Sequence, residues 1–576
     1  MTAGSVAAQG LVRLPVWRAR IVLAALVAAF AALLVRAVYL QAVKTDFLQE
    51  KGDARYSRVL EMPATRGRIT DRHGEALAVS TPVKSIWAIP SDVQLKPTQR
   101  KSLARLLGMG TRELERKLAE PEHDFVYLKR QLAPETAEAI AKLALAGIYE
   151  QREYRRYYPA GEVTAHLLGF TDVEDVGQEG LELAYEQSLG GRRGSRRVIK
   201  DRLGHIVEDV QSIRAAQDGV DLTLSIDSKI QSVAFAALKA AVERHRAKAG
   251  ALVALNVQTG EVLALANVPS FNPNNRANLT GAELRNRVIT DLFEPGSTLK
   301  PFTIALALES GKVTPQTTIA TAPGRMTLAH YTIRDVHPAA ALTVTQVLQK
   351  SSNVGAAKLA LAMPREALWD FYHRLGFGTA PQLGFPGAAA GRLRAYRSWR
   401  PIEQATMAYG HGISLSLIQL ARAYTIFALD GELAPLTLVK SELAARGEKL
   451  VSAETARAVR AMLEAAVQPD GTGPRARIVG WRVAGKTGTA HKQENGGYAA
   501  DKYIASFVGL APVSAPRVII GVMIDEPAGG YYGGSVAAPV FAEVMQATLR
   551  LLGVPHDAPL EPLERPGALD EPREST

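Results

Sequence analysis

A serine and a lysine stand three residues apart in the segment EPGSTLKPFT, residues 294–303. On a helix, the spacing of Ser297 and Lys300 puts both side chains on one face and within reach of each other. A serine hydroxyl becomes a good nucleophile only when a neighbour removes its proton. A lysine can do so when burial or a second cation lowers its pKa. The segment therefore offers a candidate nucleophile with its base, although an ordinary polar helix start has the same pattern.

Two further short motifs follow along the chain. The first is SSN, which supplies Ser351 and Asn353, and the second is KTGT, which begins at Lys486. An S-x-N pattern alone is weak evidence, because SFN at 270–272 has it too, but that copy precedes the serine–lysine pair. The strong signal is the ordered set S-x-x-K, S-x-N and K-T-G.

This ordered set resembles the motifs of penicillin-binding proteins and serine β-lactamases. The sequence around the motifs is similar as well, in EPGSTLKPFT, QKSSNVGAAKLA, AYGHGISLSLIQLARAY and VAGKTGTA. Upstream, RGRITDRHGEALAVS and YYPAGEVTAHLLGFTD resemble the non-catalytic domain of class B penicillin-binding proteins. The most similar type is the cell-division D,D-transpeptidase.

The resemblance implies roles for the residues that could transfer protons. Ser297 is the expected acylated nucleophile and Lys300 is its expected proton acceptor. Ser351 and Lys486 are expected to relay the proton to the leaving amine. The resemblance implies a peptidoglycan D,D-transpeptidase that attacks the D-alanyl-D-alanine amide of one stem peptide, releases D-alanine and passes the acyl group to an amine on a neighbouring stem. β-Lactam antibiotics are expected to acylate the same serine, and neither a metal nor an organic cofactor is expected.

The resemblance also implies which residues bind the substrate. Asn353 is expected to hold the peptide backbone of the substrate, and Thr487 and Thr489 its terminal carboxylate. The backbone N–H groups of Ser297 and Thr489 are the expected oxyanion hole, which stabilises negative charge on the attacked carbonyl oxygen. Gly488 is expected because a side chain there would keep the acyl group from lying against its strand.

The N-terminal segment predicts a membrane anchor. Residues 21–35 are apolar without interruption and span about 22 Å as a helix. Because a bilayer core is about 30 Å thick, the span must extend past Arg36 to residue 43. Arginines ahead of it predict a cytoplasmic N-terminus and an exported, periplasmic remainder in the inner membrane. These arginines are Arg13, Arg18 and Arg20.

The 576-residue length requires more than one domain. We expect an α+β protein with a cytoplasmic tail (1–20), a transmembrane helix (21–43), a non-catalytic pedestal (44–219), a transpeptidase domain (220–553) and a disordered proline-rich tail (554–576). Strand patterns at both ends of the transpeptidase domain, with helical sequence between them, predict one antiparallel sheet flanked by helices.

Charge and cysteine content narrow the possible partners. The chain has no cysteine, which excludes disulfides and thiolate chemistry, and its net charge of +11 is moderate for its length. We therefore expect no nucleic-acid partner. Because no glycosyltransferase domain is evident, the resemblance implies a separate membrane glycan polymerase of the SEDS type as a partner, together with other division proteins.

A nucleotide hydrolase is the most distant alternative. GWRVAGKT (480–487) fits the phosphate-loop pattern G-x-x-x-x-G-K-[ST], and VIIGVMIDE (518–526) ends in acidic residues as a magnesium-binding strand does. A phosphate loop must open a helix, however, whereas GTAHKQENGG after Thr487 is polar and turn-like. Nearer alternatives keep the serine: an elongation-type transpeptidase, a β-lactam-sensing receptor and a soluble β-lactamase. The expected anchor and pedestal disfavour the β-lactamase and the sensor.

Overall fold

The computed structural model describes residues 15–44, 57–119, 125–200, 206–277, 279–444, 446–494 and 497–560. The chain divides into two compact units. Unit 1 comprises Met1–Ala64, Ser85–Gln151 and Arg192–Gln217, and unit 2 comprises Thr65–Lys84, Arg152–Gly191 and Asp218–Thr576. The boundary that we expected near residue 219 therefore does not coincide with the compact units, because two segments ahead of it belong to unit 2.

An apolar helix lies near the N-terminus. Helix α1 (Val16–Val38) continues into the π-helical turn η1 (Tyr39–Val43). The stretch Val16–Ala42 is long and apolar enough to cross a membrane, and no second helix of the described residues is. The helix starts five residues ahead of the predicted span, directly after Pro15, because proline is favoured at a helix start and Val16 and Trp17 extend the apolar sequence.

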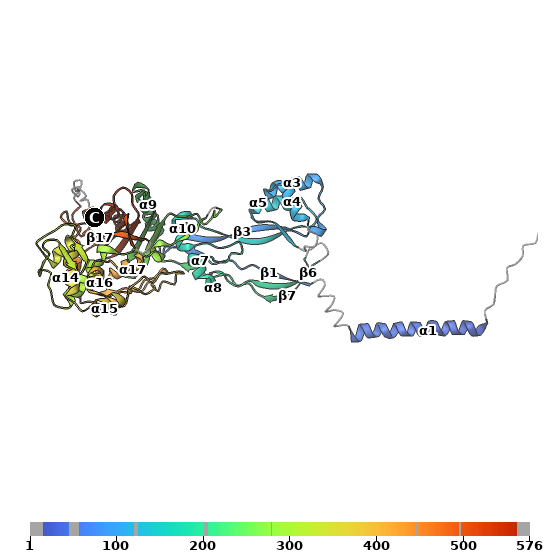
Figure 1. The fold of residues 1–576 in the computed structure, drawn as a ribbon. Coiled ribbons are helices and arrows are strands. Elements are labelled where there is room, and N and C mark those ends of the chain that lie inside the picture. Colours follow the sequence, from blue (N-terminus) through green and yellow to red (C-terminus); the bar gives the residue numbers. More distant parts are fainter. Residues whose placement is uncertain are drawn as a thin grey trace, which may run out of the picture. The chain divides into compact units, whose positions relative to one another are not determined.

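Unit 1 combines strands and short helices. Strands β1 (Ser57–Met62), β6 (Gly194–Lys200) and β7 (Ile206–Arg214) form an antiparallel sheet. Strand β4 (Val126–Leu132) is accompanied by α3 (Pro97–Leu107), α4 (Thr111–Leu118) and α5 (Pro134–Ala141) (Figure 1). Their small apolar core includes Ile86, Leu103, Leu107, Leu114, Leu128 and Ile140. This composition agrees with the expected α+β character.

The predicted hairpin around Gly74 is confirmed. Strands β2 (Ile69–Thr70) and β3 (Ala76–Ala88) pair antiparallel, and Gly74 has a φ of +89°. The turn lies against the start of α9 (Ser228–Arg244): Ser228 N–H donates to Asp71 Oδ2 (3.2 Å), and His73 Nε2 lies 3.0 Å from Asp227 Oδ2. These contacts explain why a segment far ahead of residue 220 belongs to unit 2.

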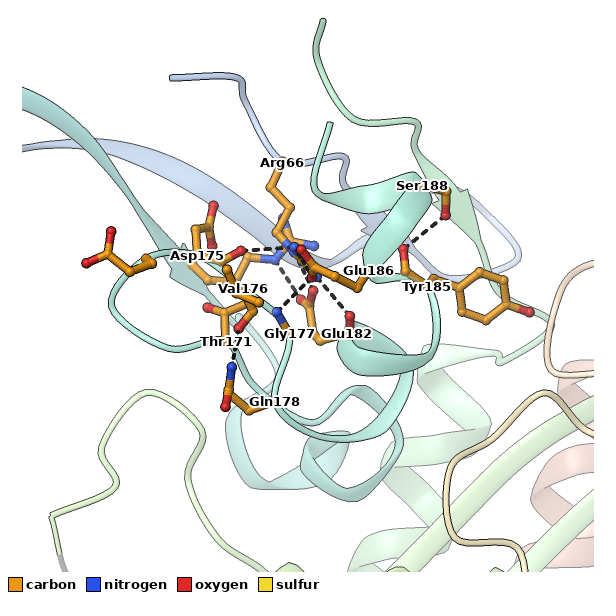
Figure 2. A network of polar contacts seen from close by, with 12 residues as sticks. Arg66, Thr171, Asp175, Val176, Gly177, Gln178, Glu182, Tyr185, Glu186 and Ser188 are labelled. Atoms are coloured by element: carbon orange, nitrogen blue, oxygen red, sulfur yellow. Dashed lines mark hydrogen bonds and ion pairs between the residues drawn. The ribbon is translucent and has the colours of Figure 1, made fainter. Parts of the chain in front are cut away.

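A buried polar network ties together other early segments of unit 2 (Figure 2). Arg66 donates from Nε to Glu182 Oε2 and from Nη1 to Glu186 Oε2, both at 2.7 Å. Arg156 donates to the second oxygen of Glu182, also at 2.7 Å. Arg66, Arg156 and Glu182 are almost completely buried. Because a buried charge is tolerated only when it is paired, removing one member would leave the others uncompensated.

The centre of unit 2 is a five-stranded antiparallel sheet in the order β10-β9-β19-β18-β17. Its strands are β9 (Ala249–Asn256), β10 (Val262–Val268), β17 (Ala484–Glu494), β18 (Gly497–Ala511) and β19 (Val518–Asp525). Two strands come from the start of the predicted transpeptidase segment and three from its end. The predicted sheet is confirmed, and β17, which carries KTGT, is its edge strand.

Helices cover both faces of this sheet. Leu252 and Ala254 of β9 belong to the core formed with α9 and α21 (Ala538–Leu551), while Ala251 and Val253 belong to the core that includes α17 (Leu417–Ala423). Alternate side chains of a strand point to opposite faces, so the continuous apolar runs of β9 and β19 follow from burial on both sides. Asp227 accepts hydrogen bonds from the N–H groups of Lys229 and Ile230, which confirms it as the cap of α9.

The remaining helices of unit 2 include a lobe with α14, α15 and α16 (Figure 1). The longer ones are α12 (Lys300–Glu309), α13 (Val344–Gln349), α14 (Asn353–Leu361), α15 (Arg365–Arg374), α16 (Pro401–Met407) and α19 (Ala453–Ala465). The short ones are α6 (Ala165–Leu168), α7 (Gly180–Ala184), α8 (Glu186–Leu189), α10 (Gly281–Leu284), α11 (Arg287–Thr290), α18 (Thr425–Ala428) and α20 (Gly533–Val536). The short strands are β8 (Leu222–Thr223), β11 (Thr318–Ala320), β12 (Arg325–Leu328), β13 (Tyr331–Arg334), β14 (Ala341–Thr343), β15 (Glu432–Leu433) and β16 (Glu448–Lys449). Strand β5 (Ile148–Tyr157) pairs with β3.

The beginning of the predicted disordered tail is packed. Val554 is buried, Trp481 Nε1 donates to the carbonyl of Pro555 (3.0 Å), and Asp557 accepts from Arg482 N–H (2.7 Å). The prediction of disorder is therefore wrong for 554–560, because an apolar residue and an acid in this stretch find partners on the preceding loop. The rest of the predicted tail, 561–576, lies outside the described residues.

Candidate functional site

Ser297 lies in a 3₁₀ turn that leads directly into a helix. The turn η4 (Gly296–Leu299) follows Pro295, and α12 begins at Lys300. The Nζ atom of Lys300 lies 3.0 Å from Ser297 Oγ, and the Lys300 side chain is completely buried. The structure therefore places the two residues of the first motif in hydrogen-bond contact.

Lys300 also contacts the second motif. Its Nζ lies 3.0 Å from Ser351 Oγ and 2.7 Å from Asn353 Oδ1, and it donates to the carbonyl oxygen of Ser351. Ser351 Oγ lies 3.0 Å from Ser297 Oγ. An ammonium group has three N–H donors for these four oxygen atoms, so the two serine hydroxyls compete for one proton position. Such a closed triangle of one amine and two hydroxyls can pass a proton among its members.

The surroundings of Lys300 disfavour its positive charge. Burial lowers the pKa of Lys300 well below its ordinary value, and the nearby charge of Lys486 lowers it further, while Asp335 opposes the shift. A lysine becomes a base only as the neutral amine, so these effects make Lys300 available as a proton acceptor.

The KTGT motif lies on edge strand β17. Lys486 is completely buried, and its Nζ donates to Thr487 Oγ1 (3.1 Å) and to Thr472 Oγ1 (3.2 Å). Within the described chain, Lys486 makes no hydrogen bond to Ser351. Burial lowers the pKa of Lys486 to about 7. Lys486 thus lies behind the threonines of its own strand and supplies charge from below.

Thr472 is a polar residue of the site that the sequence analysis did not identify. Its hydroxyl accepts a hydrogen bond from Thr487 Oγ1 (3.0 Å) as well as from Lys486. Thr489 Oγ1 accepts from the N–H of Gly533 (3.1 Å). Three threonine hydroxyls therefore surround one end of the site. A single sequence gives no signal for Thr472, because the loop PDGTGP that carries it has only the composition of a turn.

Gly488 is required for a different reason from the one predicted. A Cβ atom at this position would lie 2.3 Å from Ser506 Oγ and 2.9 Å from the carbonyl oxygen of Pro295. The space beside Gly488 is thus filled by β18 and by the turn that carries Ser297. Glycine lets β17 approach this turn closely enough to bring KTGT next to Ser297.

An open cavity of about 650 Å³ lies in front of these motifs. Five predicted site residues line it: Ser297, Ser351, Asn353, Thr487 and Thr489. Aromatic side chains of Tyr409, Tyr503 and Tyr532 contribute to the walls, and Thr472 lies at the threonine end. Lys300 and Lys486 are behind the lining. The cavity is large enough for a peptide terminus and combines apolar walls with a few polar groups, as binding sites commonly do.

The phosphate-loop alternative is contradicted by the fold. Residues 484–494 form strand β17, which continues past Thr487 and pairs with β18, whereas a phosphate loop opens a helix at this point. The prediction that the sequence after Thr487 is turn-like is also wrong, because it extends the strand. Asp525 and Glu526 end β19 and pair with Lys492, at 2.8 Å and 2.7 Å.

Comparison with protein families gives two matches along the chain. Residues 250–546 match the penicillin binding protein transpeptidase domain, and residues 61–224 match the penicillin-binding protein dimerisation domain. The two matched regions follow one another in the order expected for the transpeptidase domain and the pedestal.

Individual relatives match over nearly the whole chain. The sequence is 45% identical over 548 residues to the probable peptidoglycan D,D-transpeptidase PenA of Neisseria gonorrhoeae, with 94% of each chain covered. It is 43% identical over 549 residues to the peptidoglycan D,D-transpeptidase FtsI of Escherichia coli K12, with 94% of this chain and 93% of the relative covered. Among solved structures, the apo transpeptidase domain of penicillin-binding protein 3 from Burkholderia pseudomallei is 52% identical, with a TM-score of 0.54, and covers 58% of this chain and 98% of its own.

Proposed function

The chain belongs to the class B penicillin-binding proteins, and from that premise we propose that it is a peptidoglycan D,D-transpeptidase in which Ser297 forms the acyl-enzyme. The observation that carries the proposal is the contact between Lys300 Nζ and Ser297 Oγ at 3.0 Å, inside a cavity lined by all three motifs. The family acts on peptidoglycan stem peptides and binds β-lactams, so both are the substrates to test.

In the proposed first step, Ser297 Oγ attacks the carbonyl carbon of the D-alanyl-D-alanine amide. Its proton passes to the neutral amine of Lys300, which burial and Lys486 favour. The oxygen of the attacked carbonyl becomes negatively charged, and the N–H groups of Ser297 and Thr489 stabilise it. One such donor contributes about 100- to 1000-fold in rate in other acyl-transfer enzymes.

In the proposed second step, the C–N bond breaks and D-alanine leaves. The proton held by Lys300 reaches the leaving nitrogen through Ser351, whose hydroxyl lies 3.0 Å from both Lys300 Nζ and Ser297 Oγ. An amine of a second stem peptide then attacks the ester, and the same atoms return a proton to Ser297. Lys486 was expected to share in this relay. Its hydrogen bonds to Thr472 and Thr487 instead support a role in attracting the terminal carboxylate.

Substrate binding is proposed at the two ends of the cavity. Thr487 and Thr489 bind the terminal carboxylate, next to the buried charge of Lys486. Asn353 binds the peptide backbone, but its Oδ1 already contacts Lys300 and its Nδ2 donates to the carbonyl of Arg334 (2.9 Å). Substrate must therefore replace or share one of these two bonds, and Asn353 additionally positions Lys300.

The proposed cellular role is cross-linking at the division septum from the periplasmic face of the inner membrane. The FtsI relative supports it, together with the apolar helix Val16–Ala42 and the arginines ahead of the predicted span. We further propose the predicted division into pedestal and transpeptidase domains, and a SEDS-type glycan polymerase and other division proteins as partners, with Arg36 facing the polymerase. Depletion of the protein distinguishes division from elongation, since filaments indicate division and round cells indicate elongation. An Arg36→Leu variant that keeps the complex intact would refute the contact with the polymerase.

The chemical proposal is tested by mass spectrometry. Full-length protein in detergent is incubated with benzylpenicillin, and the intact mass is measured for wild type and for Ser297→Ala. We expect a stable adduct in wild type only. An adduct that persists in Ser297→Ala, or none in folded wild type, would contradict the assignment of Ser297. Cross-linking of purified lipid-linked precursor in the presence of a polymerase then separates a transpeptidase from a β-lactam sensor, which is acylated but forms no cross-links.

A further inference from the structure

Ser351 has an unusual backbone conformation. Its φ is +61°, in the left-handed region that residues with a Cβ atom avoid. The segment ends helix α13: Ser351 N–H donates to the carbonyl of Leu348 (3.2 Å), and Ser352 N–H donates to that of Val347 (2.9 Å). Glycine is the usual residue at such a helix end. A serine here places a hydroxyl next to Lys300, but something else in the fold must stabilise the conformation.

Asp335 holds the residues that follow Ser351. It comes directly after β13, and it is 8% exposed. Its Oδ2 accepts from Ser352 Oγ (2.7 Å), and its Oδ1 accepts from Val354 N–H (2.9 Å). Ser352 Oγ in turn accepts from Gly355 N–H (2.9 Å) and caps α14. One carboxylate thus fixes both sides of Asn353.

Asp335 also contributes to the electrostatic environment of Lys300. Four titratable side chains face Lys300 from the surrounding elements: Lys486 on β17, Asp335 after β13, and Tyr409 and His411 after α16. Burial and Lys486 lower the pKa of Lys300, and Asp335 raises it. Burial lowers the pKa of His411 to about 4 and raises that of Tyr409, so both are neutral near pH 7. Asp335 is the acid of this set.

We propose that Asp335 is a positioning residue for the acylation step, which holds Ser351 in its left-handed conformation and sets the charge balance in which Lys300 exchanges its proton. The inference rests on the proposed role of Lys300 as the base. It separates into two functions, a hydrogen-bonding clamp and an electrostatic effect, and different substitutions remove them one at a time.

Asp335→Asn removes the charge and keeps the clamp. The amide oxygen can accept from Val354 N–H, and the amide nitrogen can donate to Ser352 Oγ, so both contacts survive. Without the negative charge, the ammonium form of Lys300 becomes less favourable and the amine persists to lower pH. We expect the acidic limb of the acylation rate against pH to shift to lower pH by about half a unit to one unit.

Ser352→Ala removes part of the clamp and keeps the charge. We expect its acylation rate to fall by about tenfold at every pH, with the midpoint of the acidic limb unchanged. Asp335→Ala should show both effects. Asp430→Asn is the matched control, because Asp430 pairs with Arg457 on the surface of the same unit, and its midpoint and rate should equal those of wild type.

The measurement is the acylation rate of the full-length protein in detergent by a fluorescent penicillin between pH 5 and 9. Thermal melting shows whether each variant is folded. If Asp335→Ala does not fold, Asp335→Asn and Ser352→Ala still decide the question. An Asp335→Asn midpoint that stays at the wild-type value or moves upward overturns the electrostatic part, and a wild-type rate in Ser352→Ala overturns the clamp. If wild type itself forms no adduct that Ser297→Ala lacks, the proposed function has failed, and not this inference alone.

Discussion

The phenol hydroxyl of Tyr498 lies 3.1 Å and 3.0 Å from the two carboxylate oxygens of Glu294. Glu294 precedes Ser297 by three residues, whereas Tyr498 lies on β18. Glu294 also accepts from Gly412 N–H (2.7 Å) and from Gln493 Nε2 on β17 (2.6 Å). This carboxylate therefore connects the segment of the serine with the two edge strands of the sheet.

Tyr498→Phe removes one of these connections without changing the shape of the side chain. A hydrogen bond to a charged group contributes about 1.5 to 3 kcal/mol, and because Tyr498 is half-exposed we expect the free energy of unfolding to fall by about 1 kcal/mol. Chemical denaturation measures the loss. Tyr157→Phe is the control, because Tyr157 is similarly exposed and its hydroxyl makes no hydrogen bond in the described part of the chain. Equal stability of both variants and wild type would show that the contact has no net value.

Lys300→Met should abolish most of the acylation by penicillin. General base catalysis contributes about 100- to 10,000-fold, and the apolar replacement fits a completely buried position. Stopped-flow acylation rates test the prediction. Lys358→Met serves as control, because Lys358 caps a carbonyl group of Ala320 on the surface and should react at the wild-type rate. A Lys300→Met variant that retains more than a tenth of the wild-type rate would mean that another group accepts the proton.

Binding of carboxylate-bearing ligands should weaken at alkaline pH. Burial lowers the pKa of Lys486 to about 7, so the free protein loses this charge as the pH rises through neutrality. A bound carboxylate favours the charged form, which moves the transition upward in the complex. We expect the penicillin concentration for half-maximal acylation rate to rise above pH 7 in wild type. In Lys486→Arg the charge is permanent, and the same curve should stay flat over this range.

The same burial predicts how stability depends on pH. An unfolded lysine keeps its proton up to about pH 10.5, whereas Lys486 in the folded protein loses it near pH 7. Between these values the unfolded state binds more protons, so the contribution of Lys486 to the free energy of unfolding increases with pH. Lys486→Met removes this dependence. Relative to wild type, the variant should therefore gain stability at pH 7 and lose that advantage towards pH 10, as measured by denaturant titrations. An advantage that is equal at both pH values would contradict the lowered pKa.

Thr472 should matter for binding although no motif contains it. Thr472→Val removes the hydroxyl that accepts from Lys486 and Thr487, and a neutral hydrogen bond contributes about 0.5 to 1.5 kcal/mol. We expect the second-order acylation constant to fall about threefold to tenfold, mainly through weaker binding. Thr472→Ser keeps the hydroxyl and should restore most of it. If valine and serine behave alike, the hydroxyl is not involved.

The packed part of the C-terminal segment should stabilise unit 2. Truncation after Gly553 removes the burial of Val554 and the hydrogen bonds to Pro555 and Asp557, whereas truncation after Leu560 keeps them. We expect the shorter protein to be less stable than the longer one by about 1 to 3 kcal/mol. Thermal melting of the two truncated chains makes the comparison, and identical melting temperatures would contradict it.

The sequence by itself determined the chemistry and much of the secondary structure. Spacing within one turn was enough to pair Ser297 with Lys300, because consecutive residues of a helix have fixed geometry. The cap at Asp227, the hairpin at Gly74 and the strands β9 and β10 were likewise predictable, since local patterns of apolar, polar and glycine residues specify them.

Only the tertiary structure decided which distant residues meet and why. Thr472, Asp335 and Glu294 lie in segments without a recognisable pattern, and each acts through partners far away in the chain. The pairing of β17 with β18 at the edge of the sheet decided that Lys486 belongs to a strand and not to a phosphate loop. Packing also decided that Gly488 makes room for the turn of Ser297, and that residues 554–560 are bound to the loop around Trp481. Such contacts depend on the burial of surfaces from many segments together, which local sequence does not encode.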